Sequence, residues 1–246
     1  MDFIKNSTFN ITYRKMDDKK NPKHCGACIS KMPIFNSLTE EQIDLINQVR
    51  CRVKFNPGEV IFKQGTAMTH IIVINEGLVK VYIEGIDNRN LILRFVKPVS
   101  IIGGPGFFTD YKNHVTTMAV EETSACFIDI QTLTDIIKQN KDFAISLLQW
   151  VNNHTLLNYY KFIELTQKGM HGRIAGALLY LHNDVFKEQN GEISIKRQDL
   201  ADLTAMSKES AIRILKELKD ENIISVDGNT IILNKIDNLN NISFRG

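Results

Sequence analysis

The chain has 246 residues, of which 43% are hydrophobic and 24% are charged, and its formal net charge at pH 7 is +2. This composition excludes a disordered chain and a strongly basic chromatin-like protein, and it provides apolar material for one large domain or two modest ones. Because the sequence shows neither an apolar run of about 20 residues nor the pattern of a signal peptide, we expect a protein of the cytoplasm with no membrane partner.

The N-terminal part of the chain combines a polar stretch with a pair of cysteines. Residues 1–24 are rich in lysine, and we expect a flexible extension there. A short helix is predicted over 38–49, with Ser37 or Thr39 as its N-cap. The sequence contains four cysteines, which are too few for a disulfide scaffold, so a shared role would be metal binding or redox chemistry: Cys25, Cys28, Cys51 and Cys126.

From Cys51 to about Ile130 the chain consists of short β-rich runs separated by turns. The runs are EVIFKQ, HIIVIN, LVKVYIEG, NLILRFV, TTMAVEE and ACFIDI. Their spacing of roughly ten residues indicates a compact antiparallel roll or barrel, which we place within residues 25–140. The turn GGPGFF at 103–108 is typical of close backbone approach to a neighbour or a ligand.

Helical periodicity follows, broken weakly at Gln139-Asn140, and predicts one long helix over 141–168. Its apolar positions are spaced by three and four residues: Ile145, Leu148, Val151 or Asn152, Thr155, Leu156, Tyr159, Phe162 and Ile163. A helix of about twenty-five residues spans about 37 Å, more than a small roll can cover. We therefore expect part of the stripe to meet a second copy of the chain; packing wholly within one chain is the alternative.

Residues 169–246 predict a helical segment that ends in a β-hairpin. Helices are expected over 171–186, 196–204 and 208–222, and the hairpin turns at Asp227-Gly228. We interpret the asparagine- and lysine-rich stretch ILNKIDNLNNI as compositional drift. A helix, a tight turn, a second helix and a hairpin wing form the arrangement that places one helix in the DNA major groove.

The second helix of this pair carries the residues expected to contact DNA. An inner apolar face is predicted from Leu200, Leu203, Ile214, Leu215 and Leu218, with Ala205-Met206 as the turn and Ser207 as the cap. An outward arginine can read guanine, a glutamate can accept from cytosine, an apolar side chain can meet a thymine methyl, and lysines suit phosphates. The predicted DNA-contacting set is Lys208, Glu209, Ile212, Arg213, Lys216, Arg197 and Ser207. The alternative is an ordinary solvated face with pairing such as Glu209 to Arg213.

The order of these segments resembles the Crp/Fnr family of bacterial transcription regulators over nearly the full chain. The matching stretches are GEVIFKQGT, GLVKVYI, GGPGFF, ETSACFIDI, GRIAGALLYL and RQDLADLTAMSKESAIRILKEL. The resemblance implies an α+β fold: an N-terminal antiparallel β-roll of the cyclic-nucleotide-binding type (a double-stranded β-helix), a long dimerisation helix and a C-terminal winged helix-turn-helix. It also implies a homodimer on a palindromic double-stranded DNA operator, RNA polymerase as a partner, and Glu209 and Arg213 as base-reading residues. Lys208 stands at a position that varies between branches of the family, so only a TGA-like half-site is implied.

The resemblance leaves two candidate signals for the roll. Cyclic-nucleotide-binding members have a glutamate in the glycine turn and an arginine some ten residues later. Here Gly104 occupies the glutamate position and the stretch 113–120 contains no arginine, which disfavours a cyclic nucleotide because a buried phosphate needs a cation.

The second candidate is an iron-sulfur cluster that responds to a redox, oxygen or nitric-oxide signal. Cys25, Cys28 and Cys126 resemble the cysteines of the oxygen-sensing branch. That branch has a further N-terminal cysteine, which 31–35 lack, so the fourth ligand would be Cys51, His24, Asp17 or Asp18. The alternatives are a metal-free regulator with a small-molecule effector, in which Cys126 is a buried structural thiol and Cys51 only starts a strand, and a zinc or haem site.

An enzyme is the rival class. The sequence lacks the GxxxxGK[ST], GxSxG and GxGxxG motifs, and a cupin-like enzyme on the same roll would need clustered histidines that are not present. We therefore expect a regulator without enzymatic activity.

Overall fold

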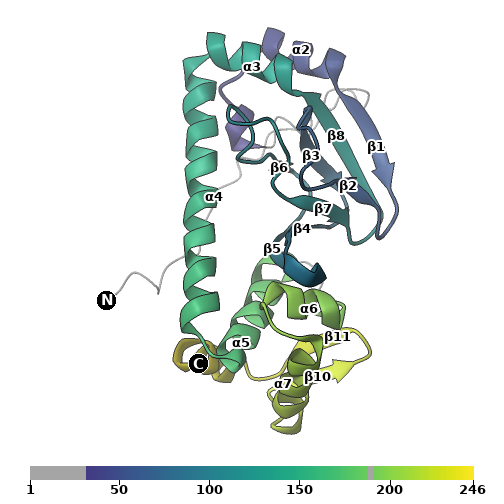
Figure 1. The fold of residues 1–246 in the computed structure, drawn as a ribbon, viewed down its shortest axis with the longest axis vertical. Helices are drawn as coiled ribbons and strands as arrows, with labels where there is room; N and C mark the ends of the chain where they lie inside the picture. The colour runs from purple at the N-terminus through teal and green to yellow at the C-terminus, as the bar shows by residue number, and fades with distance from the viewer. Residues whose placement is uncertain (1–31, 188–190) are drawn as a thin grey trace.

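A computed structural model describes residues 32–187 and 191–246 of the chain. The β-strands of the N-terminal half lie on one side of the long helix α4, and the smaller helical C-terminal part lies at the far end of this helix (Figure 1). This arrangement confirms the predicted α+β fold with a roll, a long helix and a winged helix-turn-helix.

The N-terminal half contains two antiparallel sheets of four strands. One sheet has the order β1 (Cys51–Phe55), β8 (Thr123–Asp129), β3 (His70–Glu76) and β6 (Ser100–Ile102). The other has the order β2 (Val60–Phe62), β7 (Thr116–Ala119), β4 (Val79–Glu84) and β5 (Asn90–Val96). Ile72, Ile74 and Val81 are among the buried side chains of one cluster that draws on both sheets, which closes the roll. The short strand β6 was not among the predicted runs, since three residues are too few to show a period.

Three short helical segments pack between the roll and α4; two of them precede the roll in the chain and the third follows it. They are η1 (Pro33–Phe35), α2 (Glu40–Val49) and α3 (Ile130–Gln139). Thr39, not Ser37, is the N-cap of α2, because its side chain accepts from Gln42 N while the Gln42 side chain accepts from Thr39 N. Asn140 separates α3 from α4 (Lys141–Gln167) and caps α4 through a 3.0 Å bond from Phe143 N, which confirms the predicted break.

The C-terminal part contains more than the predicted helices and hairpin. Its elements are α5 (Met170–Tyr180), the π-helical turn η3 (Leu181–Val185), β9 (Ile193–Ser194), α6 (Arg197–Leu203), α7 (Lys208–Asp220), β10 (Ile224–Asp227), β11 (Thr230–Leu233) and α8 (Ile236–Arg245). The hairpin β10-β11 is the predicted wing, and β9 extends it to three strands.

Helix α8 was not predicted; it begins within the asparagine- and lysine-rich stretch that we interpreted only by its composition. Asparagine has modest helix propensity, so the helix depends on tertiary packing. Leu239 is fully buried and Ile242 packs against the same core, while α8 lies against α5. A Cβ atom at Gly172 of α5 would stand 2.8 Å from the Gly246 backbone, so glycine permits this close approach.

Helix α4 leaves an apolar face uncovered by the described part of the chain. The exposed apolar side chains include Ile145, Leu148, Val151, Leu156, Leu157, Tyr159, Tyr160, Phe162 and Ile163, which are 44–60% exposed. The apolar stripe of α4 is therefore not fully packed within the chain. No helix among the described residues has the length and apolar content needed to span a bilayer.

Candidate nucleic-acid interface and cysteine site

Helices α6 and α7 form a supported helix pair. Leu200, Leu203, Ile214, Leu215 and Leu218 are all buried, which confirms the predicted inner face. The turn between the helices passes through a left-handed residue, Ala205, at φ 49°. Ser207 then caps α7 by accepting from Ser210 N at 3.1 Å, as predicted.

Two cations from other helices hold the turn of this pair. Lys161 Nζ of α4 donates to Leu203 O at 2.7 Å, and Arg173 Nη1 of α5 donates to Thr204 O at 3.1 Å and Ala205 O at 3.2 Å. These carbonyls lie at the end of α6, where cations are favoured. Desolvation lowers the pKa of Lys161. Neither contact was predicted from the sequence, although Arg173 lies in a stretch that carries the family resemblance.

The predicted DNA-contacting side chains of α7 are exposed together. Lys208 and Glu209 occupy its first turn, Ile212 and Arg213 the second, and Lys216 the third. Their opposite face is buried in the domain core, so the helix presents this group outward on a rigid support. The positive end of the helix dipole lies at the same end as Lys208, which favours approach to phosphate.

Arg213 forms an ion pair, but its partner is not the Glu209 expected for an ordinary solvated face. Its Nη1 pairs with Glu217 Oε1 at 2.7 Å, one turn further along α7, and not with Glu209. The second oxygen, Glu217 Oε2, lies 2.7 Å from His171 Nε2 of α5. The His171 hydrogen bond and then the Arg213 contact lower the pKa of Glu217.

Two other predicted DNA-contacting residues make structural contacts. Arg197 Nη2 donates to Gly228 O of the wing turn at 2.6 Å, so this half-buried side chain joins α6 to the wing. The Ser207 hydroxyl is engaged in the cap of α7 and donates to Ser210 Oγ at 3.0 Å.

The roll and the C-terminal part share one buried junction. Roll residues Leu78, Tyr82, Ile92 and Phe95 belong to the same hydrophobic cluster as the interior of α5, α6 and α7. Lys80 Nζ of β4 lies 2.6 Å from Asp199 Oδ1 of α6, and these side chains are only 16% and 7% exposed.

A tyrosine and a second aspartate also belong to the junction. Phe95 N donates to the Tyr180 hydroxyl at 3.1 Å, and burial raises the pKa of Tyr180 to about 12. Desolvation raises the pKa of Asp202, whose Oδ1 accepts from Gln198 Nε2 at 2.8 Å. The junction was not predicted from the sequence.

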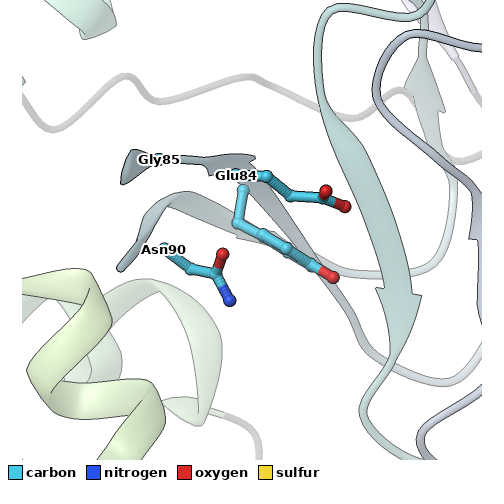
Figure 2. Close-up of a pocket in the computed structure, with 4 residues that line it drawn as sticks. Glu84, Gly85 and Asn90 are labelled. Carbon is cyan, nitrogen blue, oxygen red and sulfur yellow. The ribbon is translucent and has the colours of Figure 1, made fainter. Parts of the chain in front are cut away.

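A pocket of about 280 Å³ opens beside this junction (Figure 2). Its lining residues are Tyr82, Glu84, Gly85 and Asn90. Glu84 is bound by Thr116 Oγ1 at 2.6 Å, and none of the four lining residues is a cation. The other oxygen, Glu84 Oε2, lies 4.0 Å from Lys63 Nζ, so a cation outside the pocket lining pairs with this carboxylate, and residues 113–120 supply no arginine.

The cysteines fall in different surroundings. Cys51 begins β1 and is exposed, while Cys126 is buried in β8. Cys126 Sγ accepts from Asn75 Nδ2 at 2.9 Å and from Arg50 Nη1 at 3.4 Å. Cys25, Cys28, His24, Asp17 and Asp18 lie outside the described residues. Within 32–187 and 191–246, no group of three His, Cys, Asp or Glu side chains is arranged to hold a metal ion.

Two family models match the chain. One describes a cyclic nucleotide-binding domain and matches residues 52–140, and the other describes a Crp-like helix-turn-helix domain and matches 172–242. Together they span more than half of the chain, and each falls on one of the two parts joined by α4.

Curated relatives match most of the chain. An anaerobic regulatory protein of Bacillus subtilis is 25% identical over 208 residues, which are 82% of this chain and 87% of the relative. The cAMP-activated global transcriptional regulator CRP of Salmonella typhimurium is 27% identical over 186 residues, 73% of this chain and 88% of the relative.

Solved structures share the fold at lower identity. A protein of the crp/fnr family from Eubacterium rectale has a TM-score of 0.75 at 17% identity, with 87% of this chain and 98% of the other covered. The c-di-GMP responsive global regulator CLP of Xanthomonas campestris has a TM-score of 0.70 at 20% identity, with 79% and 99% covered. With both domain models in the expected order and relatives along most of its length, the chain belongs to the Crp/Fnr family of DNA-binding transcription regulators, which are not enzymes.

Proposed function

We propose that this regulator binds a palindromic duplex as a homodimer, with Glu209 and Arg213 reading base edges in the major groove. The observation that carries the proposal is the exposure of both side chains on a helix whose other face is buried. Lys208 and Lys216 are assigned to phosphates and Ile212 to a thymine methyl. Arg197 and Ser207 stay in the proposed interface, where their wing and cap contacts would hold the recognition helix in position.

The exposed face of α4 supports the dimer. Ile145, Leu148, Val151 and Phe162 are about half exposed. Exposure of so many apolar side chains to water is unfavourable and marks a surface that binds a partner. A second copy of α4 would cover this face and place two α7 helices about 34 Å apart, one turn of DNA. We propose RNA polymerase as a further partner. We also propose that the protein acts in the cytoplasm, where its DNA target lies.

We further propose a division of labour along the chain. Residues 1–24 are an extension, 25–140 the sensory roll, 141–168 the dimerisation helix and 169–246 the DNA-binding domain. The bounds of α4, Lys141–Gln167, and of α5, which begins at Met170, support the last two limits.

The DNA contact is tested with the full-length protein and a duplex selected by it from a random-sequence library. Arg213→Ala should cost about 1–3 kcal/mol on the selected site and flatten discrimination at one base pair. Lys216→Ala is the matched control, because loss of a phosphate contact weakens all sequences alike and reduces the salt slope by about one. If Arg213→Ala weakens every sequence equally, Arg213 contacts phosphate only.

For the signal, we propose a redox, oxygen or nitric-oxide response through an iron-sulfur cluster on Cys25, Cys28 and Cys126. Cys51, His24, Asp17 or Asp18 would supply the fourth ligand. The name of the Bacillus subtilis relative, an anaerobic regulatory protein, supports a signal of this kind. Cys126 Sγ already accepts from two donors, Asn75 Nδ2 and Arg50 Nη1, and a cysteine sulfur is the ligand that iron-sulfur clusters use.

The position of the first described residues also favours this ligand set. Met32 and Phe35 are buried in the same hydrophobic cluster as Cys126. Since Cys28 precedes Met32 by four peptide units, covalent geometry limits their separation to about 14 Å. A bound cluster would supply an oxygen-reactive redox centre. The same apolar cluster includes Phe143 and Trp150 of α4, so a change around Cys126 has a packed route to the dimerisation helix.

Anaerobic purification with iron, sulfide and absorption analysis tests this ligand set. We expect brown protein that loses iron and sulfide in Cys25→Ser and in Cys126→Ser. Cys51→Ser separates the candidates for the fourth ligand, because an exposed bystander thiol would leave the iron content unchanged. Colourless, iron-free anaerobic protein would end the cluster proposal and leave a metal-free regulator with a small-molecule effector.

A further inference from the structure

The two carboxylate oxygens of Glu217 bind side chains of two different helices, α7 and α5. Oε1 accepts from Arg213 Nη1 and Oε2 is bound to His171 Nε2, each at 2.7 Å. The group thus connects the proposed base-reading arginine to the first turn of α5.

Helix stability gives little reason for a glutamate at this position. The favourable order for an i,i+4 pair places the acid before the base, whereas here Arg213 precedes Glu217. Glu217 also lies in the second half of α7, where the helix dipole disfavours a carboxylate. Since the Glu217 side chain is 41% exposed, its ion pairs are screened by water and add little to folding.

DNA affinity gives no reason for this glutamate either. A carboxylate one turn after a base-reading arginine repels the phosphates that the neighbouring Lys216 would contact. The benefit has to come from what the carboxylate does to Arg213.

We infer that Glu217 is a positioning residue for sequence recognition, which holds the Arg213 guanidinium for a bidentate contact with guanine while His171 holds Glu217. The inference rests on the proposed reading of a base by Arg213. Arginine has five N–H donors, so one bond to Glu217 leaves donors for guanine O6 and N7. A guanidinium already held in place loses less side-chain entropy when it binds.

His171 completes the support because it comes from a different helix. The imidazole N–H on Nε2 donates to Glu217 Oε2 at 2.7 Å across the two helices. An i,i+4 pair alone would leave the glutamate free to change rotamer. The contact from α5 removes that freedom.

The test measures discrimination between two duplexes. One is the duplex selected by the full-length protein, and in the other the guanine read by Arg213 is replaced by another base. Discrimination is the Kd on the second duplex divided by the Kd on the first. Glu217→Gln should lower this ratio about 3- to 10-fold, and His171→Ala should lower it less. Glu221→Gln is the matched control, because Glu221 is exposed at the C-cap of α7 and the change removes the same charge. Both glutamine variants should bind non-specific DNA more tightly, but the control should keep the wild-type ratio.

Equal ratios for Glu217→Gln, Glu221→Gln and the wild type would overturn the positioning role. A higher ratio in Glu217→Gln would overturn it as well, since the glutamate would then compete with DNA for Arg213. Failure of the underlying proposal is separately visible, because Arg213→Ala would then leave the ratio unchanged. Thermal melting of each variant checks that the fold is retained.

Discussion

The ion pair at the junction and the ion pairs on the recognition helix have similar distances and opposite surroundings. Lys80 and Asp199 meet at 2.6 Å with little exposure, whereas Arg213 and Glu217 meet at 2.7 Å with 53% and 41% of their side chains exposed. A buried charge that loses its partner is costly, while an exposed one is solvated by water. The buried pair is therefore suited to holding the roll and the C-terminal part together. The exposed pair on α7 is suited to binding DNA, because its side chains can replace contacts with water by contacts with DNA.

The largest loss of stability is expected from breaking the ion pair at the junction. Asp199→Ala leaves the Lys80 ammonium without its carboxylate in a buried setting, and we expect a loss of about 3 kcal/mol in the free energy of unfolding. Chemical denaturation of the full-length protein measures it. The double variant Lys80→Met with Asp199→Leu should recover most of the loss, since an apolar pair replaces the charges. Equal destabilisation of the single and double variants would contradict this.

A neutral bond at the same junction should matter less. Tyr180→Phe leaves the buried Phe95 N–H without its acceptor, at an expected cost of about 1–2 kcal/mol. Because the pKa of Tyr180 is about 12, the phenol stays protonated at neutral pH and the cost should not vary across that range. A loss that follows pH would show that a different group is responsible.

A third change should raise stability and reveal a pH dependence. Desolvation raises the pKa of Asp202, so the folded protein holds this proton more tightly than the unfolded chain. Stability from this group is highest in acid, falls as pH rises through the folded pKa, and stays reduced above it. Asp202→Asn should therefore raise the melting temperature at neutral pH, and the gain should vanish below about pH 4. A gain that grows in acid would refute this sign.

The smallest expected effect on stability belongs to the recognition helix. Arg213→Ala should leave the melting temperature unchanged within error, because the ion pair it removes is exposed and screened. The same variant should lose base discrimination, so stability and recognition separate on α7. A clear drop in melting temperature would mean that the two ion pairs are less different than their exposure indicates.

Much of the fold follows from local patterns in the sequence. The alternating runs predict the strands of the roll, Asn140 marks the division before α4, and the spacing of Leu200, Leu203, Ile214, Leu215 and Leu218 predicts the inner face of the helix pair. These features depend on residues within a few turns of one another, and local geometry is what a hydrophobic period records. Helix α8 escaped prediction because its asparagine-rich sequence has weak propensity and needs α5 to be stable.

The exposed face of α7 was also accessible to sequence reasoning, but the contacts of its residues were not. Periodicity places Lys208, Glu209 and Arg213 outward, whereas it says nothing about His171 of α5 reaching Glu217. The wing contact of Arg197 and the thiol contacts of Cys126 are likewise made between separate elements.

By itself, the amino-acid sequence determined most of the segments that become strands and helices, which side of α7 faces out, and the resemblance that indicates a DNA-binding regulator. The tertiary structure alone decided that Lys80 meets Asp199, 119 positions away, and that Lys161 and Arg173 hold the turn before α7. The physical reason is that such contacts depend on how complete elements pack, and packing brings together side chains whose separation along the chain carries no periodic signal.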